Sequence, residues 1–251
     1  MTKFILSTII VALCVVLVAG ESRTQDQSPS AAVAEADQAP PIIEDVDLQD
    51  LIDSAADGDT LTIPSGTYIN NHGLVIEDRE DLTIICQSPV NIYCRDTDAD
   101  VLTIEESSGI TIAGAHLRHF EPLEEYQCHG GVVRIVESSD VLLYRCELDG
   151  CGAIGASVRS SKDVHVNKCH IHDNSFVAFY LDDSEDVKIT ESRIDNNKSM
   201  LASYSSDDQS LEMWGNTIEN NTGYWEHLRE EKIHFRRLDG KIGIESEEEG
   251  Q

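Results

Sequence analysis

The stretch SSGITIAGAHLRH, residues 107–119, sets a pattern that the chain repeats four more times. The later copies are SSDVLLYRCELDG from Ser138, SKDVHVNKCHIHD from Ser161, SEDVKITESRIDN from Ser184 and DQSLEMWGNTIEN from Asp208. The first apolar residue of each copy is its anchor, and the anchors are Ile110, Val141, Val164, Val187 and Leu211. Subtraction places them 31, 23, 23 and 24 residues apart. Repetition at a period of roughly 20 to 50 residues predicts a solenoid or an array of like units.

Apolar residues recur two positions apart within each copy. Ile112 follows the anchor Ile110 by two residues, Ala115 and Leu117 follow by five and seven, and the later copies keep this spacing. A further apolar pair stands eight and six positions before the anchors, as in Leu102 and Ile104. Because side chains of a strand alternate between its two faces, these pairs predict three strands per repeat. Their inward positions are −8/−6, 0/+2 and +5/+7 relative to the anchor.

The residues before the repeat predict a short helix and a strand. Leu48, Leu51, Ile52 and Ala55 share one helix face, with Asp47 and Gly58 suited to its two ends. Residues 59–68, DTLTIPSGTY, then alternate like a strand that ends in a turn.

Together with the repeat, this start resembles the first coil of the right-handed parallel β-helix proteins, the pectate-lyase-like superfamily, over residues 45–223. The resemblance implies an all-β fold: a right-handed parallel β-helix built from a single chain, a three-sheet solenoid of about seven coils closed by an N-terminal capping helix. In the family a polar ladder, often of Asn, fills the corner that the +5 column occupies. Asn216 matches it, whereas Ala115, Cys146, Cys169 and Ser192 depart from it.

Four segments follow from composition and pattern. Residues 1–20 read as a secretory signal peptide, with an uncleaved membrane anchor as the alternative. Residues 21–41 lack large apolar side chains and predict a disordered linker. The β-helix occupies 42–223, and 224–251 form a capping hairpin around Asp239-Gly240 and an acidic tail.

The charge of the chain limits its partners. With 47 acidic and 18 basic residues its net charge is −29. Proteins that bind nucleic acids or anionic membrane surfaces do so through clustered Lys and Arg. Because this chain is strongly acidic, neither is expected as a partner, apart from a membrane reached through the N-terminal segment.

The resemblance implies that the −8/−6 strands form the first sheet, whose outer surface holds the active site in the enzymes of the family. Our substrate-binding candidates on or beside this face are Arg134, Arg159, Tyr180, Tyr204, Asp182 and His129. Two guanidinium groups and a ring can hold a carboxylate or a sugar. An inserted loop, residues 121–128, precedes the strand that carries Arg134. The alternative is that both arginines pair with surrounding carboxylates.

A second group of polar residues falls on the outer side of the third strand, at +6 and +8. His170, His172, Glu147 and Asp149 are weak candidates for a transition-metal site, because residues two apart on a strand share a face. A solvated face of mixed charge is the alternative. No cofactor is predicted. Calcium is kept as an alternative that no motif supports: Asp96, Asp98 and Asp100 begin like a calcium loop, but the Gly and Glu that such a loop requires are missing.

Six cysteines follow the signal segment, and an even number favours an oxidising compartment. Cys128 and Cys151 each precede an anchor by 13 residues, and Cys146 and Cys169 each follow one by five. Each pair therefore stacks on neighbouring coils, which predicts the bridges Cys128–Cys151 and Cys146–Cys169 and leaves Cys86 with Cys94.

Three functions agree with these observations. The first is a secreted, periplasmic or cell-surface module that binds carbohydrate, a polysaccharide or a cell-surface glycan, without catalysis. It is favoured because no complete catalytic signature of the superfamily is present. The alternatives are a small polysaccharide lyase or glycoside hydrolase acting on the first-sheet face, and a structural or adhesive spacer.

Overall fold

The computed structural model describes residues 39–120, 129–150, 152–203, 209–226 and 233–237, all within one compact unit, Ala39–Gln251. The expected signal segment, most of the linker, the loop 121–128 and the acidic tail lie outside these residues. Across the described ranges, no helix is both long and apolar enough to cross a membrane.

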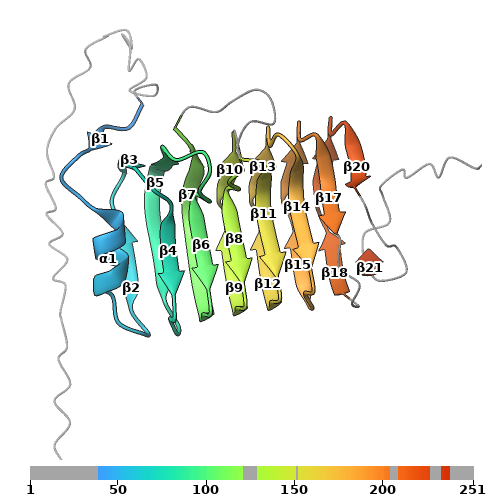
Figure 1. Cartoon of the computed structure of the whole chain (residues 1–251), viewed down its shortest axis with the longest axis horizontal. Helices are drawn as coiled ribbons and strands as arrows, with labels where there is room; N and C mark the ends of the chain where they lie inside the picture. The colour runs from blue at the N-terminus through green and yellow to red at the C-terminus, as the bar shows by residue number, and fades with distance from the viewer. Residues whose placement is uncertain (1–38, 121–128, 151, 204–208, 227–232, 238–251) are drawn as a thin grey trace, which may run out of the picture. The chain divides into compact units, whose positions relative to one another are not determined.

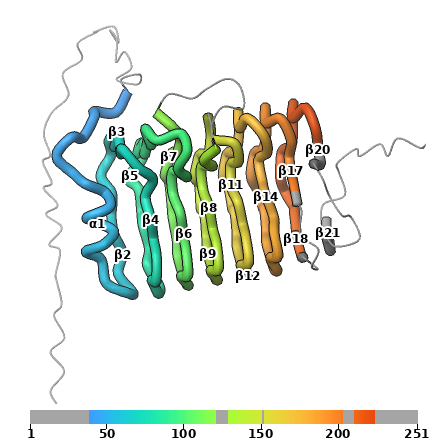
Figure 2. The backbone as a smooth tube through the Cα atoms, viewed as in Figure 1, coloured from blue at the N-terminus to red at the C-terminus, as the bar shows by residue number. Residues whose placement is uncertain are grey.

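Among the described residues, the first sheet consists of seven strands, stacked side by side along the solenoid (Figure 1). In chain order they are β4 (Leu74–Glu77), β6 (Leu102–Glu105), β8 (Val133–Val136), β11 (Ile154–Arg159), β14 (Val177–Asp182), β17 (Ser199–Ser203) and β20 (Gly223–Glu226). Each pairs in parallel with its counterpart in the next coil. The chain thus returns to the same sheet once per coil, and Figure 2 follows these turns.

The second and third sheets merge into one 14-stranded sheet, because two strands run unbroken around the corner between them. These are β5 (Thr83–Cys94) and β7 (Ser108–His119), each 12 residues long. The first coil instead supplies β2 (Thr60–Ile63) and β3 (Gly66–Asn70). Later coils have separate second-sheet strands, which are β9 (Ser139–Tyr144), β12 (Lys162–Asn167), β15 (Val187–Thr190) and β18 (Gln209–Trp214). Their third-sheet strands are β10 (Glu147–Asp149), β13 (His170–His172), β16 (Arg193–Asp195) and β19 (Thr217–Glu219).

The predicted three-strand frame is confirmed, because residues of one column are register partners in the core. Val141 pairs with Ile110 and with Val164, and all three are at most 1% exposed. Leu148 pairs likewise with Leu117 and Ile171, each fully buried. Burial of one such side chain contributes about 1.5–3 kcal/mol. The coils therefore contribute equivalent buried apolar side chains, which stack in columns, to the core.

Left-handed backbone turns the chain at the corners. The residue before each +5 position has a positive φ, namely Gly114, Arg145, Lys168, Glu191 and Gly215. At Gly114, φ is +79°, and a Cβ would lie 3.0 Å from the carbonyl oxygen of Cys86. Glycine fits this corner because it has no Cβ to meet that oxygen.

A serine ladder lines the corner between the first and second sheets. Its members are Ser107, Ser138, Ser161 and Ser184. The amide of each of the first three donates to the hydroxyl oxygen of the next, at 3.1, 3.1 and 3.3 Å. Each hydroxyl in turn lies 2.7–2.9 Å from the carbonyl oxygen two residues earlier in its own coil. Buried backbone amides that the sheets leave unpaired thereby gain acceptors.

The +5 column forms a second ladder at the next corner. The amide of Cys146 donates to Cys169 Sγ at 3.4 Å, Cys169 to Ser192 Oγ at 3.1 Å, and Ser192 to Asn216 Oδ1 at 2.8 Å. Cysteine and serine thus take the place that the resemblance gave to Asn. A third ladder joins Asn174, Asn197 and Asn221 in the same way.

The predicted bridges Cys86–Cys94 and Cys146–Cys169 are wrong in this structure, where all four cysteines are free and buried. Cys146 and Cys169 are rungs of the ladder, and each sulfur contacts a carbonyl oxygen two residues earlier, at 3.6 and 3.4 Å. Cys86 lies in the second-sheet half of β5 and Cys94 at its third-sheet end, opposite Ile63 and His119 respectively, too far along extended chain for a bridge. The predicted Cys128–Cys151 bridge falls outside the described residues.

The N-terminal helix α1 (Leu48–Ser54) packs on the edge of the first sheet (Figure 1). Asp47 caps it by accepting from the amides of Gln49 and Asp50. The Gln49 side chain binds both the amide and the carbonyl of Val75, at 2.8 and 2.9 Å, as a neighbouring strand would. The guanidinium of Arg79 donates to the last carbonyls of the helix. Beside the helix, β1 (Ile42–Ile43) adds a parallel strand to β3.

Parallel pairing continues past residue 223 at the other end. β20 pairs with β17, and β21 (Ile233–Arg237) pairs in parallel with β18. Residues 233–237, which we expected to form the first strand of a capping hairpin, therefore extend the second sheet. The second half of that hairpin lies outside the described residues.

Candidate functional site

The outer face of the first sheet brings together four of the six predicted binding residues. Arg134 on β8, Ser157 on β11 and Tyr180 on β14 are register partners on consecutive coils. Arg159 and Asp182 are partners in the adjacent column. The face thus presents a row of polar groups about 4.8 Å apart, the spacing of hydrogen-bonded strands.

Arg159 is engaged by its neighbours. Its Nη2 lies 3.3 Å from Asp182 Oδ2, and its guanidinium carbon lies 5.9 Å from the centre of the Tyr180 ring. The two charged side chains are 47% and 26% exposed, so water screens the pair and its net contribution is small. For Arg159, the alternative of an ion pair with a carboxylate is therefore the one observed.

Arg134 has no such partner. No ion pair joins it to any side chain in the described part of the chain, and its Nε is buried without a hydrogen-bond acceptor. Its register partners are Thr103 and Ser157, whereas Arg159 has Asp182 across the register. Within the described residues, the guanidinium therefore has no anionic partner of its own.

The remaining two candidates do not join the row. His129 is 84% exposed and its Nδ1 lies 2.9 Å from Oδ1 of Asp98, which is 74% exposed. The acidic turn that contains Asp98 is held by its own chain: Asp98 donates its amide to Asp96, and Asp100 accepts from the amide of Gly131. Tyr204 lies outside the described residues.

The outer face of the third sheet gathers histidines and carboxylates more closely. Glu147 on β10 is the register partner of His116 and His170, and Asp149 is the partner of Arg118 and His172. On β16, the next strand, Arg193 and Asp195 continue the two columns. All four weak metal candidates thus lie on one face, as the +6/+8 spacing predicted.

Hydrogen bonds on this face run diagonally between the columns. His116 Nε2 lies 2.7 Å from Asp149 Oδ1, and His170 Nε2 lies 2.6 Å from Asp195 Oδ1. His172 has two partners, Glu147 Oε1 at 3.1 Å through Nε2 and Asp173 Oδ2 at 2.6 Å through Nδ1.

These contacts shift the titration of the groups involved. The hydrogen bond from His172 lowers the pKa of Glu147 to about 2, although burial opposes this. Burial of the His172 ring disfavours its charge, but the bonds to Glu147 and Asp173 outweigh it and raise the pKa of His172 to about 9. Burial also acts to raise the pKa of Asp195, and His170 and Arg193 outweigh it, so that the pKa is lowered.

Three of these residues are placed for metal binding. Ligand atoms of Glu147, His170 and His172 all lie within 4.8 Å of one another. The two imidazole rings stack with centroids 3.9 Å apart and planes 26° from parallel. Two imidazole nitrogens and a carboxylate oxygen are ligands that transition metals accept. Asp149, the fourth candidate, instead binds His116 and Arg118.

The sequence interpretation did not assign a role to Asp173, although it ends the motif HIHD beside His172. The feature of the sequence that could have indicated this contact is that Asp173 directly follows His172. A residue directly after a strand can turn back to the last side chain of that strand, which Asp173 does with φ of 54°.

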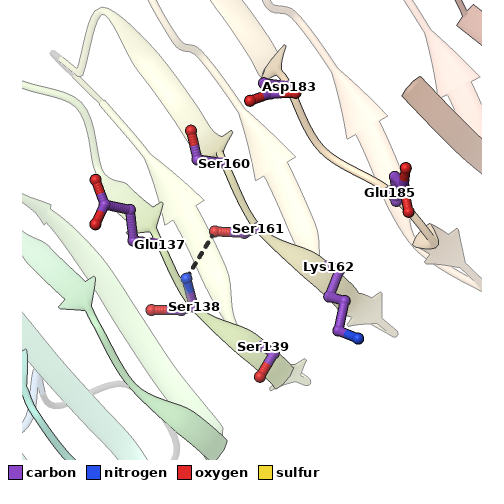
Figure 3. A pocket seen from close by; sticks show the side chains of 8 residues that line it. All are labelled: Glu137, Ser138, Ser139, Ser160, Ser161, Lys162, Asp183 and Glu185. Atoms are coloured by element: carbon purple, nitrogen blue, oxygen red, sulfur yellow. Dashed lines mark hydrogen bonds between the residues drawn. The ribbon is translucent and has the colours of Figure 1, made fainter. Parts of the chain in front are cut away.

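A shallow hollow of about 390 Å³ lies where the serine ladder turns the chain (Figure 3). Its lining residues are Glu137, Ser138, Ser139, Ser160, Ser161, Lys162, Asp183 and Glu185. Figure 3 shows the ladder bond from Ser138 to Ser161 within it. The hydroxyl groups of Ser138 and Ser161 already take part in the ladder. The turn of the chain between the first and second sheets accounts for the hollow.

Three stacked parallel sheets, polar ladders at the corners and a helix over one edge define a β-helix. The chain belongs to the family described as "Right handed beta helix region", whose profile matches residues 90–237. No curated protein matches the sequence.

Two solved structures share this fold at low sequence identity, and a third is more distantly similar. PfbA, a surface adhesin of Streptococcus pneumoniae, is 14% identical with a TM-score of 0.54, over 75% of this chain and 60% of that one. A putative glycosyl hydrolase from Parabacteroides merdae is 12% identical with a TM-score of 0.52, over 77% and 87%. The periplasmic alginate epimerase AlgG is 14% identical with a TM-score of 0.37, over 72% and 61%. The chain therefore spans less than two thirds of the adhesin, and the likeness is one of fold.

Proposed function

We propose that this protein is a secreted, periplasmic or cell-surface module that binds a polysaccharide along the outer face of its first sheet, without cleaving it. The observation that carries the proposal is Arg134, whose guanidinium has no anionic partner among the described residues of a chain that bears 47 acidic side chains. An unpaired cation on such a surface is suited to a ligand from outside the chain.

The neighbours of Arg134 suit a sugar polymer. Thr103, Ser157 and Tyr180 share its register column, so hydroxyl groups and one guanidinium follow each other coil by coil. A repeating ligand that lies across the strands meets a polar group at each of these four coils, about 4.8 Å apart. The ligand class is a polysaccharide rich in hydroxyls that carries isolated carboxylates, because the net charge of −29 repels a continuous polyanion.

Binding rather than cleavage is favoured by the state of the other charged groups on this face. Arg159 and Asp182 already pair with each other, so this carboxylate is engaged within the protein before a ligand arrives. At the level of the fold, the adhesin PfbA provides an example of a surface protein with this architecture.

A glycan array probed with the full chain tests the proposal, followed by affinity measurements on the positive glycans with Arg134→Gln. Loss of the guanidinium should weaken binding by about tenfold or more, since a hydrogen bond to a charged group contributes roughly 1.5–3 kcal/mol. Arg145→Gln is the matched control, because it removes the same charge from the corner between the second and third sheets, where Arg145 stacks on Tyr144.

Equal weakening by both substitutions would attribute binding to net charge and contradict the proposed face. Failure to bind any glycan would favour a spacer. New reducing or unsaturated ends after incubation would show an enzyme instead of a binding module.

A further inference from the structure

The cluster on the outer face of the third sheet contains two histidines, His170 and His172. Their ring nitrogens face different carboxylates. Nε2 of His170 faces Asp195, whose side chain is 4% exposed, so Nδ1 of His170 is left for another ligand. Nδ1 of His172 faces Asp173, which leaves Nε2 directed at Glu147. Each ring therefore has a fixed carboxylate on one nitrogen, while the other nitrogen faces the candidate ligand Glu147 in His172 and has no partner among the described residues in His170.

We propose that Glu147, His170 and His172 bind a divalent transition-metal ion of the zinc class, which bridges the neighbouring strands β10 and β13. The ion takes the place of the proton shared by His172 Nε2 and Glu147 Oε1, now 3.1 Å apart, and recruits the free nitrogen of the stacked His170 ring. This site is separate from the first-sheet face and does not depend on the glycan proposal.

The partners of the two rings are the ones that metal-binding histidines require. A ligating histidine usually donates its other N–H to a carboxylate, which fixes the ring and makes the ligating nitrogen more basic. Asp195 supplies that carboxylate for His170 and Asp173 supplies it for His172. Asp195 is itself held by Arg193 at 3.1 Å, so its position is fixed before an ion arrives.

The donor set selects the class of ion. Two imidazoles and one carboxylate suit zinc, copper or nickel, whereas calcium and magnesium require mostly oxygen ligands. Three protein ligands leave one position of a tetrahedral zinc ion open, and Glu147, 44% exposed, lies toward solvent. The ligand atoms now lie within 4.8 Å, so small rotations of the side chains bring them to one ion.

Calorimetric titration of the full chain with zinc chloride tests the site, with the wild type expected to bind one tight equivalent. His170→Gln and His172→Gln should each weaken binding by at least tenfold. Asp195→Asn changes the carboxylate that holds the His170 ring and should weaken binding by roughly 10- to 100-fold. Cobalt(II) in place of zinc provides a spectroscopic readout, because its visible absorption differs between imidazole-bound and fully hydrated ions.

Two controls separate this site from general attraction of cations to an acidic surface. His165→Gln removes a histidine of the same coil from the second-sheet face, and His116→Gln removes one from the same face that contacts Asn91 and Asp149. Neither should change the tight equivalent. Glu147→Gln is the variant to use if a histidine variant fails to fold, because this side chain is 44% exposed and lies at the surface.

The proposal is wrong if zinc binds wild type and His170→Gln or Glu147→Gln with equal affinity, or if no tight equivalent is found. It is also wrong if cobalt keeps the spectrum of the hydrated ion in the wild-type protein.

Discussion

The amide of Cys146 donates to the sulfur of Cys169, 3.4 Å away and 23 residues later in the chain. The two thiols therefore occupy places that hydroxyl and amide groups fill further along the same ladder, at Ser192 and Asn216. Sulfur is a weak acceptor and a weak donor, yet it can fill such a position when burial excludes water. These cysteines belong to the backbone hydrogen-bonding of the corner.

We predict that Cys86, Cys94, Cys146 and Cys169 are all labelled when the protein is denatured and alkylated without reductant. In the native protein, burial raises the pKa of Cys86 to about 12, so its thiol stays protonated near neutral pH and should react slowly. Peptide mapping by mass spectrometry locates the labels. Protection of any pair among these four until a reductant is added would show that a bridge forms.

Substitution of Cys169 should distinguish a ladder rung from simple filling of space. Cys169→Ala leaves the buried amide of Cys146 without an acceptor, which costs about 1–3 kcal/mol in addition to the lost contacts. Cys169→Ser keeps an acceptor, as at Ser192, and should be the more stable variant. Urea denaturation gives the two free energies of unfolding, and equal losses would contradict the role of the sulfur as acceptor.

Asn197 should be among the most sensitive positions of the third ladder. Its Oδ1 accepts from the amide of Asn174 at 3.1 Å, and its Nδ2 donates to the carbonyl of Ile171 at 3.0 Å. Asn197→Ala orphans both buried groups, so we expect a loss of about 3 kcal/mol or more in the free energy of unfolding. Asn220→Gly is the control, because Asn220 is exposed with φ of 55° and glycine adopts that conformation freely. A comparable loss in both variants would argue against the ladder.

The columns of the core could be predicted from sequence because they depend on two spacings alone. Alternation by two residues places Ile110 and Ile112 on one face, and the repeat period places Val141 beside Ile110. Neither inference needs the position of a single side-chain atom. The same arithmetic placed Glu147, His170 and His172 on one outer face.

The partners of polar groups could not be predicted in this way. Column membership puts Cys146 beside Cys169, but whether two sulfurs bond or stack depends on the direction of each side chain at the corner. The serine at the start of the first four copies was visible in the sequence. Its role, however, follows from left-handed residues such as Glu137 and Ser160, which turn the amide of the next residue toward the neighbouring coil. Likewise, Arg134 and Arg159 look alike in the sequence, and only the register opposite each shows that one has a carboxylate and the other has none.

His165 should make the metal-free protein less stable in acid. Its Nε2 lies 2.7 Å from Oγ1 of Thr190 on the second-sheet face, and burial together with the charge of Lys188 lowers the pKa of His165 in the folded protein. The unfolded chain, with a histidine pKa of about 6.5, therefore binds the proton more readily than the folded chain. The stability that the neutral ring provides is complete above about pH 6.5 and is lost as the pH falls through the folded-state pKa.

His165→Gln keeps a partner for Thr190 and does not titrate. We therefore expect the wild type to lose stability relative to this variant below about pH 6.5, by at most about 1.4 kcal/mol per pH unit. Urea denaturation at several pH values, with a chelator present, measures the difference. His129→Gln is the control, since that ring is 84% exposed and should not reproduce the effect. If the difference between wild type and His165→Gln stays constant across this range, the buried neutral ring is not a source of acid lability.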